Sequence, residues 1–189
     1  AIHEPQEVEV VERAAEEYIV DTDFHAGPSS DMADLLPYID DEIVSRKLEV
    51  TGTIPGVAGV QSTWACNLDM GYHTHGVAND TEDVLEVMDR FCIDAPIVGP
   101  GMNKLITVQY PRMKNAVISG LNDYLLDRIV SPADNIYTHV ALPIWDPEAC
   151  VAELDRVGDE KGVVGAYGWY GPFSSLLGEP KYDQLYDRL

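Results

Sequence analysis

Short apolar segments alternate with helix-like segments along most of the sequence, and this alternation constrains the fold more than any other feature. The apolar segments have the length of buried strands and lie at 18–23, 93–98, 136–142 and 163–167. Helices are expected at 31–49, 80–91, 114–129, 146–157 and 182–189. Because the connections are short, consecutive strands should run parallel with right-handed crossovers. The pattern predicts an α/β fold with four parallel strands.

The first predicted strand carries metal-binding residue types at its carboxyl end. Asp23 and His25 are two residues apart, so in a strand they project from one face while Phe24 points to the other. Carboxylate oxygen and imidazole nitrogen suit zinc, manganese or iron. Asp21 lies one step further back on the same side, where it is placed to orient a ligand. Taken alone, this short motif favours the alternative, in which the aspartates cap the following Gly-Pro turn, because short motifs often match by chance.

The position of this motif helps to choose between two α/β architectures. A doubly wound sheet and a (β/α)8 barrel both accommodate parallel strands joined by helices. No GxGxxG motif of the dinucleotide-binding doubly wound sheet occurs in the sequence. Barrel enzymes place their chemistry at the carboxyl ends of strands, where Asp23 and His25 lie. We therefore expect residues 18–189 to form the N-terminal part of one (β/α)8 TIM barrel, after an acidic leader at 1–17.

The charge balance narrows the classes of partner. The chain has 33 acidic and 12 basic residues, for a net charge of -21. Nucleic acids and anionic membranes are disfavoured as partners because they bind clustered lysine and arginine. A hydrophobic content of 46% argues against disorder, so the charge indicates adaptation to high salt, which screens self-repulsion. With no secretory signal or membrane-span pattern, we expect a cytoplasmic protein.

The three cysteines do not indicate a disulfide framework. Cys66, Cys92 and Cys150 are widely separated and odd in number, and none belongs to a CxxC pair. Cys92 and Cys150 have apolar neighbours in the sequence and are expected to be small core residues.

Several segments together carry a resemblance to a known family. They follow an acid-x-His strand in a fixed order, and they are Asn122–Leu125, Asn135–Pro143, Asp146–Ala149, Glu153–Arg156 and Gly162–Gly165. In this order and spacing they resemble the amidohydrolase-related family. This is the branch of the amidohydrolase superfamily that contains aminocarboxymuconate semialdehyde decarboxylase and the resorcylate decarboxylases.

The resemblance implies a metal-bearing (β/α)8 barrel. In that family the first strand ends in two residues that bind a divalent metal, and Asp23 and His25 occupy those positions here. The aspartate departs from the commoner histidine or glutamate. Zinc is the first expectation for the metal, with manganese or iron as alternatives. No lysine lies near the end of the fourth predicted strand, so a carboxylated lysine bridging two metals is not expected, and we predict one ion.

The length of the chain is short for the whole barrel. A (β/α)8 barrel takes about 250 residues, whereas this sequence has 189. The family's remaining ligands are histidines at the fifth and sixth strands and an aspartate at the eighth, which also serves in proton transfer. All would lie beyond Leu189. We therefore expect the first four βα units here, without the catalytic residues, and no activity from this chain alone.

Other histidines and aromatic residues are candidate substrate contacts. His139 lies in the third predicted strand, and its alternative role is that of a packed histidine. His73 and His75 share the i, i+2 spacing in a glycine-rich loop region, but no apolar strand precedes them. Trp169 and Tyr170 follow the fourth strand, where they could line a substrate pocket or anchor a loop.

Together these features predict a metal-dependent enzyme. The resemblance implies a hydrolase or a non-oxidative decarboxylase (a carboxy-lyase) that acts on a small, carboxylate-bearing or aromatic substrate. Homo-oligomer formation is left open. The alternative is a non-catalytic binding or assembly module derived from the same fold, and such a module would carry no metal.

Overall fold

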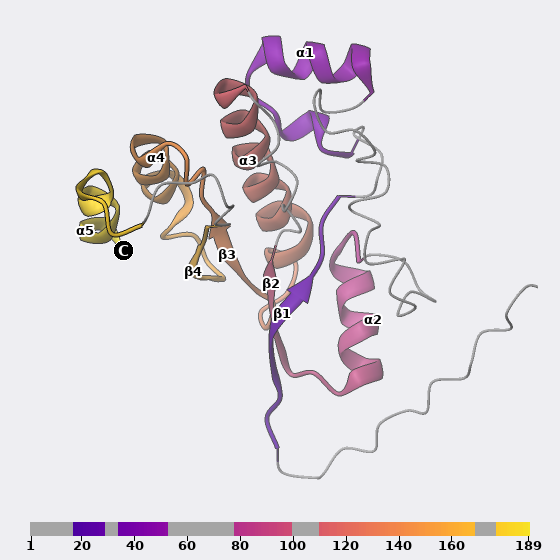
Figure 1. Cartoon of the computed structure of the whole chain (residues 1–189). Helices are drawn as coiled ribbons and strands as arrows, with labels where there is room; N and C mark the ends of the chain where they lie inside the picture. Colours follow the sequence, from indigo (N-terminus) through magenta and orange to yellow (C-terminus); the bar gives the residue numbers. More distant parts are fainter. Residues whose placement is uncertain (1–16, 29–33, 53–77, 100–109, 169–176) are drawn as a thin grey trace, which may run out of the picture.

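The computed structural model describes residues 17–28, 34–52, 78–99, 110–168 and 177–189, in which strands and helices alternate (Figure 1). The strands are β1 (Val20–His25), β2 (Ala95–Gly99), β3 (Tyr137–Ala141) and β4 (Val163–Tyr167). The α-helices are α1 (Glu42–Thr51), α2 (Thr81–Phe91), α3 (Pro111–Leu125), α4 (Pro147–Val157) and α5 (Asp183–Arg188). Shorter helical turns are η2 (Leu36–Tyr38), η6 (Leu126–Val130) and η7 (Pro180–Tyr182).

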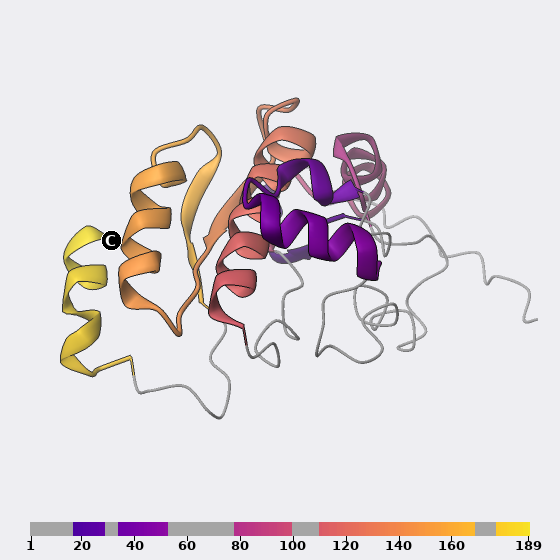
Figure 2. The same cartoon turned by 90° about the horizontal axis from the view of Figure 1, so that it is seen from above.

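The four strands form one parallel sheet in the order β1-β2-β3-β4. Helices α2, α3 and α4 each connect one strand to the next, as Figure 2 shows from above. A doubly wound sheet changes direction at a switch point, whereas a (β/α)8 barrel adds its strands in sequence order. The observed order is therefore that of the first half of a barrel, and the predicted set of four parallel strands is confirmed.

Some predicted boundaries were displaced. Strand β1 is Val20–His25 and not 18–23, so His25 belongs to the strand itself. Helix α3 begins at Pro111, earlier than the predicted 114. Proline suits the first helical turn because a backbone N–H there has no acceptor within the helix, so the lack of an N–H costs nothing. The helix then continues into the π-helical turn η6. Most of the glycine-rich segment at 50–80 lies outside the described residues, as does Cys66.

Aspartate caps fix where three helices begin. Asp41 accepts hydrogen bonds from the backbone N–H groups of Ile43 and Val44 at 3.0 and 3.1 Å. Asp80 and Asp146 cap α2 and α4 in the same way, through the N–H groups three residues on. Such caps satisfy donors that have no partner within the helix, at about 1 kcal/mol each. The predicted starts of α2 and α4 are thereby confirmed.

The core lies between one face of the sheet and the helices. Phe24 and Val98 point into it and belong to the same cluster as Val117 and Leu121 of α3. A second cluster joins α4 to α5, which lies outside α4 in Figure 1. Because the helices cover this face, strand residues that point the other way are free to carry chemistry.

The two described cysteines differ in role. Cys150 is fully buried in the cluster between α4 and α5, as predicted, and burial raises the pKa of its thiol to about 12. The prediction for Cys92 was wrong. Cys92 is only partly buried and caps the end of α2 with φ 55°, in the left-handed region. Its role at this position is to end the helix.

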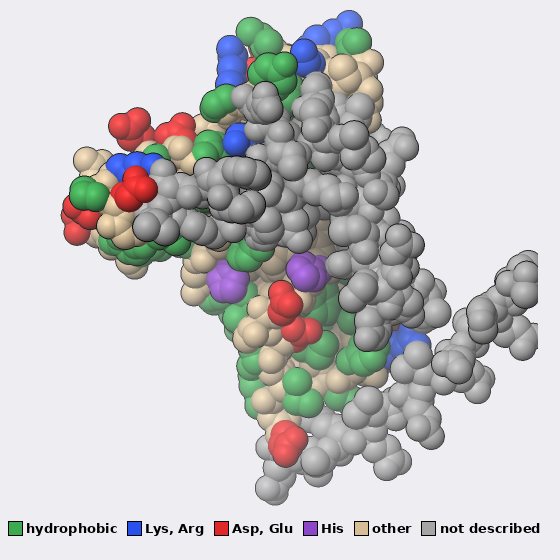
Figure 3. Space-filling view, in the orientation of Figure 1, with side chains coloured by type: hydrophobic (Ala, Val, Ile, Leu, Met, Phe, Trp, Pro, Cys, Tyr) green, Lys and Arg blue, Asp and Glu red, His purple; other side chains and the backbone are tan. Residues whose placement is uncertain are grey.

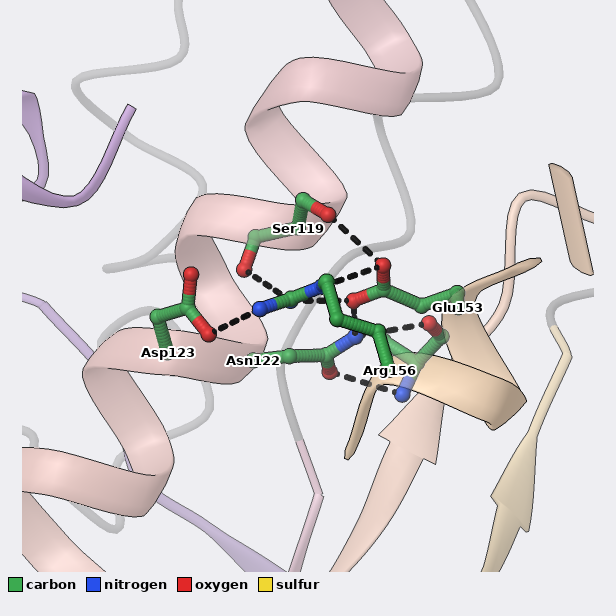
Figure 4. Close-up of polar contacts among 6 residues, drawn as sticks. Ser119, Asn122, Asp123, Glu153 and Arg156 are labelled. Atoms are coloured by element: carbon green, nitrogen blue, oxygen red, sulfur yellow. Dashed lines mark hydrogen bonds and ion pairs between the residues drawn. The ribbon is translucent and has the colours of Figure 1, made fainter. Parts of the chain in front are cut away.

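A polar network locks α3, α4 and β3 together on the helix side of the sheet (Figure 4). We call it the helix-layer network, and it consists of Ser119, Asn122, Asp123, Glu153 and Arg156. The buried Glu153 carboxylate accepts hydrogen bonds from Ser119 Oγ at 2.6 Å, Asn122 Nδ2 at 2.7 Å and the Arg156 guanidinium at 2.7 and 3.0 Å. Arg156 also pairs with Asp123 and donates to the backbone carbonyl of Ser119. Each carboxylate in the network is therefore paired with Arg156, which is shared between them.

The network also holds the end of strand β3. Asn122 donates to the carbonyl of Ala141 at 3.0 Å and accepts from the Ala141 N–H at 2.8 Å. Burial works to raise the pKa of Glu153, but hydrogen bonds from Arg156, Ser119 and Asn122 outweigh it and lower that pKa. The segments that carry the family resemblance thus include residues of the helix-layer network, for which the sequence had suggested no role.

No helix in the described parts of the chain is long and apolar enough to cross a membrane.

Candidate metal and substrate site

Asp23 and His25 project together from the face of β1 that no helix of the described residues covers, which we call the uncovered face. Phe24 between them is buried at 6% exposure, whereas the side chains of Asp23 and His25 are 93% and 45% exposed. The distance between His25 Nε2 and Asp23 Oδ1 is 3.8 Å. Two donors that are exposed and this close can approach one ion from the same side. The structure thus brings together the two residues proposed as metal ligands.

Asp21 lies directly behind this pair. Its carboxylate accepts a hydrogen bond from the backbone N–H of Asp23 at 2.9 Å. The pairing of β1 with β2 shifts register between Asp21 and Phe24. The Asp21 carboxylate therefore supports the backbone next to a candidate ligand, in a stretch where the strand ladder is irregular.

His139 lies on the neighbouring part of the same face. Figure 3 shows the two described histidines on one face of the molecule, with acidic side chains beside them. His139 is half-buried and is paired in register with Gly165 of β4. An imidazole in this position can donate or accept a hydrogen bond towards a ligand near Asp23 and His25.

Tyr167 is a site residue that the sequence analysis missed. It is the last residue of β4 and pairs with Ala141 at the end of β3. Burial raises the pKa of Tyr167, and the carboxylate charge of Asp23 raises it further. Alternation along β4 places Tyr167 on the same face as Gly165, which lies against His139. The sequence did hold a signal for this residue. Tyr167 follows Gly165 by two positions in the fourth strand, so the two residues lie on one face.

The donor set fits the start of a metal centre. Among the described residues, no three His, Cys, Asp or Glu side chains are grouped closely enough to hold an ion. Asp23 and His25 supply one carboxylate and one imidazole, which suit manganese, zinc or iron. A catalytic ion commonly takes three or more protein ligands. His73, His75, Trp169 and Tyr170 lie outside the described residues.

A cleft of about 480 Å³ lies elsewhere, on the helix side of the sheet. Its lining includes Tyr38, Asp41, Arg112 and Arg156. Arg112 is already paired with Asp41, and Arg156 belongs to the helix-layer network. The cleft is therefore lined by ion pairs that are already complete, and it lies on the opposite side of the sheet from Asp23 and His25.

Several solved structures similar to this chain are decarboxylases. A 5-carboxyvanillate decarboxylase from Novosphingobium aromaticivorans, complexed with manganese and 4-hydroxy-3-methoxy-5-nitrobenzoic acid, matches with a TM-score of 0.60 at 15% identity. That match covers 90% of this chain and 47% of the decarboxylase. A 2,6-dihydroxybenzoate decarboxylase from Rhizobium matches with a TM-score of 0.57 at 18% identity, over 92% of this chain and 46% of that one.

The fold is that of half a (β/α)8 barrel. A further 2,6-dihydroxybenzoate decarboxylase, complexed with 2,6-dihydroxybenzoate, matches with a TM-score of 0.54 at 18% identity, over 90% of this chain and 45% of its own length. This chain therefore spans less than half the length of the structures it matches. No family model matches the sequence, and no curated protein matches it. The neighbours are decarboxylases of the amidohydrolase superfamily, the group that the sequence resembles.

Proposed function

We propose that this chain forms the metal-binding first half of a non-oxidative decarboxylase of hydroxylated aromatic acids. The observation that carries the proposal is the Asp23 and His25 pair, exposed 3.8 Å apart at the carboxyl end of the first strand of a half-barrel. Structural neighbours that match 90% or more of this chain are decarboxylases, and one is complexed with manganese and a hydroxylated benzoic acid. The neighbours favour decarboxylation over the hydrolase alternative.

Each residue has a proposed task. Asp23 and His25 would hold one divalent ion, for which manganese is the first choice and zinc or iron are alternatives suited to the same donors. Such an ion supplies Lewis-acid binding of a carboxylate or phenolate oxygen. His139 would contact the substrate. We keep His73, His75, Trp169 and Tyr170 as proposed substrate-side residues, together with adaptation to high salt, a cytoplasmic location and homo-oligomer formation as predictions.

The remaining parts of the site are proposed to lie in a second half of the barrel. Two ligands fall short of the three or more that a catalytic ion takes. The neighbours contain about as much chain again as the matched part. We therefore propose that the missing ligands and the proton-transfer residue come from four further βα units, and that this chain alone binds metal but does not turn over substrate.

The metal site is tested by elemental analysis of purified protein dialysed against Mn²⁺ and then against buffer. Wild type should retain manganese, and Asp23→Ala and His25→Ala should lose most of it. Asp134→Ala is the matched control, because the Asp134 side chain is also 93% exposed but lies far from β1 in sequence and pairs with Lys161. Absence of metal from wild type, or equal loss in the control, would contradict the proposal and favour a non-catalytic module.

The reaction class needs a second experiment. A polypeptide that joins this sequence to a second half-barrel should release CO2 from 2,6-dihydroxybenzoate or 5-carboxyvanillate when Mn²⁺ is present. The release should disappear with His25→Ala. Hydrolysis of esters or amides without CO2 release would favour the hydrolase alternative.

A further inference from the structure

Gly165 provides the space in which the imidazole of His139 lies. A Cβ atom built on Gly165 would lie 2.9 Å from His139 Cδ2 and 3.4 Å from Nε2. The first distance is shorter than real Cβ contacts allow, so a side chain at 165 would displace the ring. The imidazole therefore lies directly against the β4 backbone, at a place where every residue other than glycine would add atoms.

Tyr167 continues the same face of β4. It follows Gly165 by two residues, so the Cα–Cβ bonds at the two positions point the same way. Burial raises the pKa of Tyr167, and the charge of Asp23 raises it further, as expected for two side chains on one face of the sheet. The β3 and β4 side of this face thus carries an imidazole and a phenol, and β1 at the other edge of the sheet carries Asp23 and His25.

We propose that Gly165 is a positioning residue, which seats His139 beside Tyr167 so that these two side chains bind the anionic oxygens of a hydroxybenzoate opposite Asp23 and His25. The inference rests on the proposed function and names the substrate contacts of the same site. It adds Gly165 and Tyr167 to the residues that the sequence had indicated.

The chemistry of the strands supports donors of this kind. Neither lysine nor arginine occurs in the sequences of the four strands that the structure describes. An anionic substrate that enters this face therefore meets no strand-borne cation. An imidazole N–H and a phenol O–H are donors placed there by His139 and Tyr167, and each can bind a carboxylate or phenolate oxygen.

A double-mutant cycle tests the positioning role. Binding of 2,6-dihydroxybenzoate in the presence of Mn²⁺ is measured by NMR titration for wild type, Gly165→Ala, His139→Ala and the double variant. We expect Gly165→Ala to weaken binding about three- to tenfold, the worth of one hydrogen bond. In the His139→Ala background the same change should have no further effect, because the ring it displaces is absent. Tyr167→Phe should weaken binding about threefold, with the ring retained.

Two further measurements separate the possible failures. The imidazole Hδ2 signal of His139 should shift in Gly165→Ala even without ligand, while the thermal midpoint and the retained manganese stay as in wild type. Equal binding by wild type and Gly165→Ala, an unshifted Hδ2 signal, or equal losses in both backgrounds would overturn the positioning role and leave the metal site intact. Failure of wild type to retain Mn²⁺ would instead contradict the proposed function.

Discussion

The two faces of the sheet treat polar side chains in opposite ways. On the helix side, Glu153 is buried and its carboxylate receives hydrogen bonds from Ser119, Asn122 and Arg156. On the uncovered side, Asp23 and His25 are exposed, and the nearest approach between them is 3.8 Å. Complete satisfaction of polar groups is typical of a structural network, whereas exposed donors that converge are typical of a binding site. The difference separates residues that stabilise the fold from residues that are proposed to bind a metal and substrate.

The largest expected effect is the loss of Glu153. Glu153→Ala leaves Arg156 without its buried partner and removes acceptors from Ser119 and Asn122, so the free energy of unfolding should fall by about 2–3 kcal/mol. Urea unfolding followed by circular dichroism measures the change. The matched control is Glu49→Ala, which removes an exposed ion pair with Arg46 and should cost no more than about 0.5 kcal/mol. Similar losses of unfolding free energy in both variants would show that Glu153 stabilises the fold no more than an exposed ion pair does.

Glycine-to-alanine changes compare packing on the two sides directly. A Cβ on Gly120 would lie 2.7 Å from the backbone carbonyl oxygen of Tyr38, which cannot move as a side chain can. Gly120→Ala should therefore cost about 1–2 kcal/mol despite the better helix propensity of alanine. Gly165→Ala meets only the ring of His139 and should cost less than about 0.5 kcal/mol. Thermal unfolding of both variants tests this order, and the reverse order would contradict the comparison.

The pH dependence of stability should follow Glu153. Its pKa is lowered in the folded protein, so its contribution to the free energy of unfolding is present above its ordinary value of 4.5 and is lost as the pH falls. Asp123 acts in the opposite direction. Burial raises its pKa, so its contribution to the free energy of unfolding becomes more favourable as the pH falls. The stability difference between wild type and Glu153→Gln should therefore shrink from pH 7 to pH 4, by less than the full cost of Glu153→Ala. A difference that grows over this range would contradict the assignment.

The smallest expected effect on stability is at the uncovered face. Asp23→Ala and His25→Ala remove exposed side chains, so each should change the free energy of unfolding by no more than about 0.5 kcal/mol. Metal retention should nevertheless be lost in both. A large loss of stability in the absence of metal would mean that this pair is structural, and it would remove the contrast between the two faces.

The sequence predicted the elements better than their contacts. Strand and helix alternation is a local signal, and it located the parallel strands and the helix starts near 80 and 146 correctly, where Asp80 and Asp146 cap α2 and α4. The spacing of Asp23 and His25 placed both on one face for the same reason. The hydrogen bonds of Ser119 and Asn122 to Glu153, and the contact of His139 with Gly165, join residues that lie about 25 to 35 positions apart in the chain and meet only after packing. Cys92 was misjudged because apolar sequence neighbours do not reveal a left-handed helix end.

The central claim is that a divalent metal binds the uncovered face at the carboxyl end of β1. The most direct test is Mn²⁺ added to isotope-labelled protein in about 1 M salt, which shortens the screening length to roughly 3 Å and suppresses diffuse binding to a chain of net charge -21. Paramagnetic broadening should be strongest for signals of His25, His139 and Tyr167, weak for Glu153, and absent in the His25→Ala variant. Broadening centred on the helix-layer network, or unchanged by His25→Ala, would contradict the claim.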